Sequence, residues 1–322
     1  MSEQLNQPLF DPESLAYGDA VVSEAANNLR VDIDELAASA EPSVLVQIKT
    51  DPRGATSPVT RHDQETEERI GAAYAGTSVR IKGEEGVNRW PADKAPTLEL
   101  HVDPIDGTEL FIEYVEQLIG WQQLPEDNRP PRPTCGSMIS AGAIRPGSNT
   151  PEWAAIAAPF ASTDGTIRWN VGPGVPATRI EPDGSRRPLP LAGELSTPET
   201  GGVILVASNS AERIFGGPLQ DAGYRVIKLK SAVAAALCAM DPGLFERLRP
   251  GELDGDPIVG VAMRTAKNWD VAGVVAVAND REHFVSTTDG NPRTFEDGAN
   301  SAIIAIRASI GRAVVGTLAP YL

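Results

Sequence analysis

The 322-residue chain carries 28 Lys and Arg residues against 44 Asp and Glu residues, a formal net charge of −16. Such acidity argues against binding to nucleic-acid polymers or to anionic membranes, because both carry negative charge themselves. The length favours two α/β lobes that share a cleft, which we expect to comprise residues 1–160 and 161–322.

The first half of the chain predicts helices and strands in alternation. Residues 12–30 and 63–75 have helical patterns, and Asp63 is a candidate N-cap of the second helix. β-prone segments predict strands over 43–49, 78–82 and 97–102. Asp103 is therefore expected where the third strand ends. Apolar residues recur at helical spacing from Leu110 to Ile119, which places Gly107 and Thr108 near a helix N-terminus.

Two breaker-rich segments, 124–133 and 181–200, are predicted to be loops because proline removes backbone donors and disfavours helix. The remaining chain predicts three helices and three strands, which suggests a second lobe of α/β character. The helices are expected over 211–222, 231–240 and 270–278, and the strands over 203–207, 225–229 and 258–263. The longest apolar runs are too short to cross a bilayer, and the N-terminus lacks a basic signal region. Cys135 and Cys238 form no CxxC motif, so we expect a reducing, cytoplasmic location.

The segment from His101 to Thr108, HVDPIDGT, contains residues that could supply part of the ligands of a metal site. Two carboxylates, Asp103 and Asp106, flank a rigid proline, and Gly107 permits a turn that a Cβ would hinder. Oxygen ligands suit a hard cation, and free amides at a helix N-terminus suit a phosphate group. This combination indicates metal-assisted phosphate hydrolysis.

Three further segments complete a recognisable set. Gly-Glu-Glu lies at 83–85, Trp-Asp-x-Ala-Gly at 269–273, and Ser-Pro-Val-Thr-x-x-Asp at 57–63. Together with Asp-Pro-Ile-Asp-Gly-Thr at 103–108, this ordered set resembles the signature of the inositol monophosphatase superfamily of lithium-sensitive, magnesium-dependent phosphatases. The resemblance extends from about residue 14 to the end and is weakest between residues 120 and 200. Its nearest branches are inositol monophosphatase and 3′-phosphoadenosine-5′-phosphate phosphatase. It implies a layered α-β-α-β-α sandwich of the sugar phosphatase type, with the active site between two lobes, and a homodimer.

The resemblance also implies roles for individual residues. The implied metal ligands for two or three Mg²⁺ ions are Glu84, Asp103, the Ile105 carbonyl, Asp106 and Asp270. Thr108 matches the threonine that orients the attacking water, with Glu84 or Asp63 accepting its proton. The amides of Gly107 and Thr108 would hold the phosphoryl oxygens. Because Asp270 lies 164 residues beyond Asp106, it must come from the other lobe. Taken alone, Asp270 would be a helix N-cap, and both roles are compatible.

The substrate is a small phosphate ester whose identity the sequence leaves open. Met263 stands where inositol monophosphatases have a glutamate that contacts the inositol hydroxyls, which argues against a standard inositol pocket. A nucleotide, nucleoside or sugar phosphate is the main expectation, and an inositol phosphate or histidinol phosphate is the alternative. A protein that binds a phosphorylated ligand without turnover is the alternative of another class.

Four residues are singled out for weaker reasons. Lys230, Ser231 and Lys267 are candidate substrate residues, although solvated lysines at a surface are a common alternative. His62, like the other two histidines, shows no spacing typical of a zinc site, so we do not expect it to be a metal ligand.

Overall fold

The structure is a computed structural model that describes residues 11, 13–39, 46–50, 56–86, 95–148, 150–195, 201–287, 291, 295, 300–305 and 308–321. For residues 56–57, 265–266, 300–305 and 308 the description covers the backbone only. No helix in these ranges is long and apolar enough to span a bilayer.

The larger sheet has seven strands in the order β3-β4-β5-β6-β7-β8-β9. Its strands are β3 (Val79–Gly83), β4 (Leu98–Asp106), β5 (Met138–Ile144), β6 (Trp153–Ala158), β7 (Ile167–Gly172), β8 (Val175–Ile180) and β9 (Arg186–Pro188). β3 and β4 are parallel and every later pair is antiparallel. The division of the chain into two lobes at residue 160 stays a prediction. The larger sheet continues past that residue, through β9.

The smaller sheet has five strands in the order β11-β10-β12-β14-β13. Its strands are β10 (Val203–Val206), β11 (Arg225–Lys228), β12 (Ile258–Ala266), β13 (Phe284–Ser286) and β14 (Asn300–Ala305). β10 pairs in parallel with β11 and β12, whereas β14 runs antiparallel to β12 and β13. A separate hairpin joins β1 (Val46–Thr50) to β2 (Thr56–Thr60).

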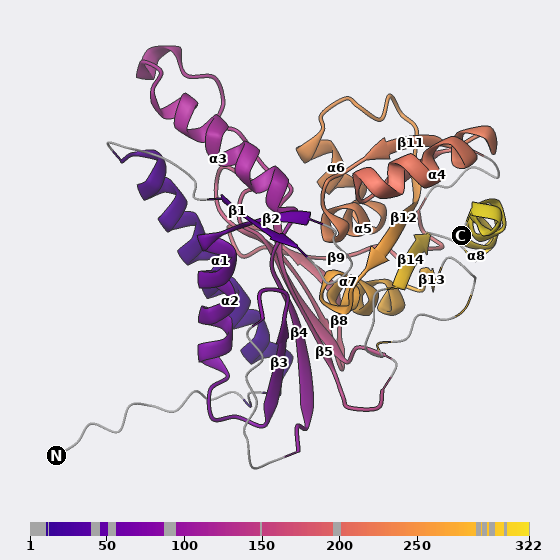
Figure 1. Ribbon diagram of the computed structural model, residues 1–322, viewed down its shortest axis with the longest axis horizontal. Helices are drawn as coiled ribbons and strands as arrows, with labels where there is room; N and C mark the ends of the chain where they lie inside the picture. The colour runs from indigo at the N-terminus through magenta and orange to yellow at the C-terminus, as the bar shows by residue number, and fades with distance from the viewer. Residues whose placement is uncertain are drawn as a thin grey trace.

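Helices lie outside and between the two sheets (Figure 1). The outer layer on the larger sheet contains α1 (Leu15–Ala37), α2 (Arg61–Ala73) and α3 (Thr108–Gln122). The central layer contains α5 (Ala232–Met240), α6 (Pro242–Leu248) and α7 (Asn268–Asp280). The outer layer on the smaller sheet contains α4 (Asn209–Asp221) and α8 (Ala308–Leu318). Short 3-10 turns cover Glu126–Asn128 and Ala319–Tyr321.

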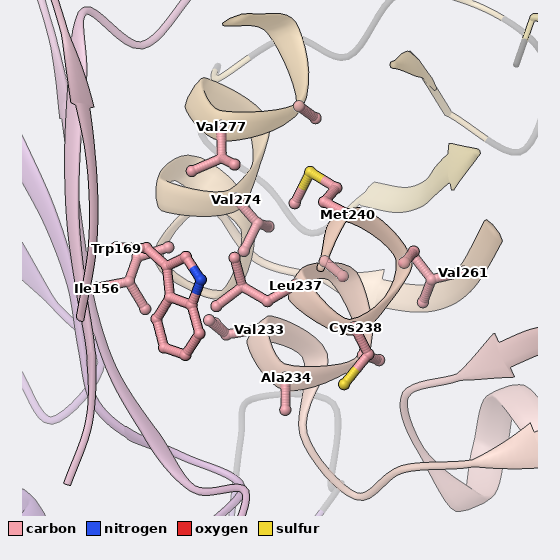
Figure 2. Close-up of a cluster of buried hydrophobic side chains, with 14 of the residues drawn as sticks. Ile156, Trp169, Val233, Ala234, Leu237, Cys238, Met240, Val261, Val274 and Val277 are labelled. Atoms are coloured by element: carbon pink, nitrogen blue, oxygen red, sulfur yellow. The ribbon is translucent and has the colours of Figure 1, made fainter. Parts of the chain in front are cut away.

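Three apolar cores hold these layers together, one at each outer layer and the largest around the central helices. Figure 2 shows the central core, where Trp169 of the larger sheet faces Leu237 of α5 and Val274 of α7. Apolar burial of this extent is the main favourable term in folding. The layer order is α-β-α-β-α, which confirms the fold class expected from the sequence.

Element bounds differ from the sequence-based predictions in a few places. α1 continues to Ala37, seven residues beyond its predicted end, because Ile33 and Ala37 extend its buried stripe. The strand predicted to end at Val102 continues to Asp106, with an irregular register between Asp103 and Asp106. The predicted loop 181–200 contains β9. Residues 12, 43–45 and 196–200 of the predicted elements lie outside the described residues.

The central helices approach the larger sheet at a close contact between Gly142 of β5 and α7. A Cβ on Gly142 would lie 2.6 Å from backbone atoms of Ala272 and Gly273. A Cβ on Gly273 would lie 2.5 Å from the Ser140 hydroxyl. The small residues of the Trp-Asp-x-Ala-Gly motif therefore let α7 sit directly on the sheet, and this contact fixes the start of α7.

Candidate active site

Several chain elements end or begin at one cleft of about 440 Å³ between the two sheets. β3 ends beside it, β4 contributes its last residues, and α3, α4 and α5 begin there. The N-terminal ends of these helices carry partial positive charge, which offsets the carboxylates gathered in the cleft. The cleft is lined by Pro58, Glu84, Asp103, Ile105, Asp106, Gly107, Thr108, Glu109, Ala207, Ser208, Asn209, Ser210, Lys230, Ser231, Ala232, Met263, Arg264 and Asp270.

Three of the predicted metal ligands, Glu84, Asp103 and Asp270, come together in this cleft. Each offers a carboxylate oxygen within 4.8 Å of those of the other two. Asp103 is buried, and its Oδ1 has no hydrogen-bond partner in the part of the chain that the structure describes. Burial, followed by repulsion from Glu84 and Asp106, raises the pKa of Asp103 well above its usual range. A buried, like-charged group of oxygen ligands fits a divalent cation, which would remove the repulsion.

Asp270 lies in the first turn of α7, two residues after the helix begins at Asn268. It is therefore not the N-cap that its position after Trp269 suggested. Its Oδ2 instead accepts the backbone N–H of Lys267, the residue that precedes the helix, at 2.6 Å. Burial and then Glu84 raise the pKa of Asp270 to about 8.

Asp106 has a different environment, because its carboxylate faces the start of α5. It accepts hydrogen bonds from the Ser231 hydroxyl, from the Ala232 N–H at 3.0 Å and from the Val233 N–H at 2.8 Å. Burial raises the pKa of Asp106 to about 6, although these hydrogen bonds oppose the shift. Both oxygens of Asp106 are therefore engaged, and its predicted role as a metal ligand stays a prediction.

Gly107 and Thr108 form the start of α3, as the sequence predicts. Gly107 has a φ of 83°, a left-handed conformation that favours glycine. The Thr108 hydroxyl donates to Asp63 Oδ1 at 3.0 Å, and it also lies 3.1 Å from the Ile105 carbonyl. Burial raises the pKa of Asp63 to about 6, against the opposing hydrogen bonds from Thr60 and Thr108.

Asp63 is not the N-cap of α2, which begins two residues earlier at Arg61. Thr60 is the N-cap, and a capping box joins the two residues. The Thr60 hydroxyl accepts the Asp63 N–H at 3.4 Å, and the Asp63 carboxylate accepts the Thr60 N–H at 2.7 Å. The capping box therefore holds the Asp63 carboxylate through Oδ2, while Oδ1 accepts from the Thr108 hydroxyl.

Sequence reasoning missed two charged residues beside the carboxylate group. Lys49, at the end of β1, donates to Glu84 at 2.8 Å and to Glu85 at 2.6 Å. Glu67 of α2 is fully buried and accepts the Glu85 N–H at 2.7 Å. Both residues come from segments outside the motifs, and no local pattern distinguishes them from ordinary strand or helix residues.

The three candidate substrate residues have different positions. Lys230 lines the cleft and forms ion pairs with Glu113 at 2.6 Å and with Glu109 at 3.4 Å. Ser231 is the N-cap of α5 and donates to Asp106. The Lys267 ammonium lies 4.9 Å from the centre of the Trp269 ring. A role in substrate binding stays a prediction for all three.

Comparisons with known proteins identify the fold. No protein-family model and no curated protein matches the sequence. Among solved structures, the extragenic suppressor protein SuhB of Bartonella henselae aligns with a TM-score of 0.64 at 14% identity, covering 94% of this chain and 97% of that chain. The IMPase of Thermotoga maritima aligns with a TM-score of 0.63 at 14% identity, covering 95% and 97%. Inositol monophosphatase II of Staphylococcus aureus aligns with a TM-score of 0.60 at 16% identity, covering 95% of each chain. The resemblance inferred from the motifs is thus confirmed in the fold.

Proposed function

We propose that the chain is a divergent member of the inositol monophosphatase superfamily that hydrolyses a small-molecule phosphate monoester with the help of a divalent cation. The observation that carries the proposal is the meeting of Glu84, Asp103 and Asp270 in one cleft with the N-terminus of α3. The three carboxylates attract a cation, and the free amides at the N-terminus of α3 attract an anion. Metal-assisted hydrolysis of a phosphate ester needs both kinds of group.

The chemistry of the donor set favours magnesium. Glu84, Asp103 and Asp270 offer only oxygen atoms, and hard cations prefer such ligands to nitrogen or sulfur. Asp106 and the Ile105 carbonyl are proposed to contribute to the same two- or three-ion site. When bound, the cation would supply charge neutralisation and a more acidic water. Raised pKa values at Asp103 and Asp270 are the expected mark of a site built for a positive charge.

The protein's own residues are proposed to position the phosphate and the attacking water. The Gly107 and Thr108 amides at the start of α3 would bind phosphoryl oxygens. The Thr108 hydroxyl donates to Asp63, so its lone pairs are available to accept from a water molecule. With a pKa of about 6, Asp63 is mostly ionised at neutral pH and can accept a proton through Thr108. Glu84 is the alternative proton acceptor.

The substrate proposed is a nucleotide, nucleoside or sugar phosphate, with an inositol or histidinol phosphate as the alternative. Met263 is buried and lines the cleft, so it presents a thioether where an inositol site would need a hydrogen-bond acceptor. Loss of such a contact weakens discrimination by about 1–3 kcal/mol for each unmade hydrogen bond. We also propose a cytoplasmic homodimer that binds neither nucleic-acid polymers nor membranes.

Phosphate release measured with and without Mg²⁺ across sugar phosphates, nucleotides, inositol phosphates and histidinol phosphate tests the proposal. Activity that requires the cation and falls by orders of magnitude in Asp103→Asn and Asp106→Asn is the expected result. Asp221→Asn, at the exposed end of α4, is the matched control. Wild-type activity in both site variants at saturating Mg²⁺ would refute the site. Ligand binding without phosphate release would instead support the non-catalytic alternative.

A further inference from the structure

A second group of Asp, Glu and His side chains lies on the outer helices, apart from the cleft. Asp32 of α1 and His62 and Glu65 of α2 each offer a ligand atom, and these atoms lie within 4.8 Å of one another. His62 and Glu65 are three positions apart on one helix, so they lie on the same face. Asp32 comes from the neighbouring helix. The group therefore joins α1 to α2.

The histidine supplies an observation independent of the two carboxylates. His62 is 5% exposed, and its buried Nδ1 has no hydrogen-bond partner among the residues that the structure describes. This nitrogen lies 3.8 Å from Glu65 Oε2, too far for a hydrogen bond but close enough for both atoms to meet one ion. A buried imidazole nitrogen is normally paired, so one that lacks a hydrogen bond and lies 3.8 Å from a carboxylate oxygen requires an explanation.

The surrounding charges leave room for a cation. Arg69 pairs with Asp32 Oδ2 at 2.8 Å, and Arg61 pairs with Glu65 Oε1 at 3.2 Å. Arg69 and Arg61 are 38% and 60% exposed, and exposed pairs of this kind contribute little to stability. Each arginine contacts one carboxylate oxygen, so among the described residues Asp32 Oδ1 and Glu65 Oε2 stay available to an ion. Burial lowers the pKa of His62, so the imidazole is neutral at pH 7 and can act as a ligand.

We propose that Asp32, His62 and Glu65 form a site for a first-row transition-metal ion such as Zn²⁺, distinct from the site in the cleft. One nitrogen and two carboxylate ligands are a common donor set for Zn²⁺, whereas Mg²⁺ prefers oxygen alone. Three protein ligands leave a coordination position for water. The ion would tie the C-terminal part of α1 to the first turn of α2, which also carries Asp63.

Binding of Zn²⁺ to the full-length protein in excess Mg²⁺ tests the proposal. Calorimetry should give one Zn²⁺ site that persists in Asp270→Asn and weakens at least tenfold in Asp32→Asn and in Glu65→Gln. Both of these side chains are partly exposed, so the variants should fold, and urea unfolding without metal checks this. Arg69→Gln is the matched control, because it breaks the same ion pair but keeps the Asp32 carboxylate.

Unchanged Zn²⁺ affinity in both carboxylate variants would overturn the proposal, as would loss of the only Zn²⁺ site in Asp270→Asn. Weakening in Arg69→Gln equal to that in Asp32→Asn would also overturn it, because the ion pair and not the ligand would then matter. Visible absorption of bound Co²⁺ gives a second measurement. Its bands should disappear in His62→Ala and remain in Asp270→Asn.

Discussion

Asp270→Asn should stabilise the metal-free protein while abolishing the proposed phosphatase activity. The folded pKa of Asp270 is raised to about 8 by burial and by Glu84. In the unfolded chain an aspartate titrates near ~3.9. Between these values the folded protein holds one more proton than the unfolded chain. The contribution of the protonated Asp270 carboxyl to stability is therefore fully present below about pH 4, and it is lost as the pH rises through the folded pKa of about 8.

The magnitude follows from this proton difference. Because the folded protein binds one more proton, its free energy of unfolding falls by about 1.4 kcal/mol for each unit by which the pH rises. Asparagine does not titrate, yet its side-chain oxygen can still accept the Lys267 N–H that Asp270 accepts at 2.6 Å. The stability difference between Asp270→Asn and the wild type should therefore grow by roughly 4 kcal/mol from about pH 5 to about pH 8.

Urea unfolding in the presence of a chelator, at several pH values, measures this difference. Asp221→Asn on the exposed end of α4 is the control and should show no pH-dependent difference. Mg²⁺ at 100 times its Kd should stabilise the wild type by about 2.7 kcal/mol and the Asp270 variant by less. A difference that does not change with pH, or a variant no more stable than the wild type near pH 8, would show that Asp270 does not belong to a desolvated, like-charged group.

Three other predictions concern catalysis, packing and specificity. Thr108→Ala should lower kcat by roughly 100-fold with little change in KM, because in the proposed mechanism the Thr108 hydroxyl, which donates to Asp63, accepts from the attacking water. Steady-state kinetics that show only a KM change would contradict this. Gly142→Ala should lower the free energy of unfolding by about 1–3 kcal/mol and weaken Mg²⁺ binding, because the added Cβ would push α7 and Asp270 away. Urea unfolding and Mg²⁺ titration measure the two effects, and no change in either value would argue against this contact. Met263→Glu should raise kcat/KM for inositol 1-phosphate about tenfold relative to the best other substrate, and an unchanged ratio would remove Met263 as a specificity residue.

Local sequence was sufficient to predict the strand and the helix on either side of the Asp103–Thr108 motif. The strand before Asp103 and the helix after Gly107 follow from patterns within about ten residues. The glycine at 107 is required by its left-handed backbone, and Ser231 begins α5 because its hydroxyl accepts an amide of the first turn. These are short-range effects, so the sequence predicts them. By contrast, the antiparallel strands β5 to β8 were not predicted, because small, apolar segments such as Trp153–Ala158 show no alternation when both faces are buried.

The arrangement of the carboxylates was decided only by tertiary structure. Asp103 and Asp106 are equivalent in the motif, yet the irregular register of β4 leaves Asp103 with Glu84 and directs Asp106 to the N-terminus of α5. The same holds for His62, whose sequence neighbours suggest no metal site until the packing of α1 on α2 brings Asp32 beside it. Pairing between distant segments depends on sheet register and helix packing, which are set by the whole core and not by local preference.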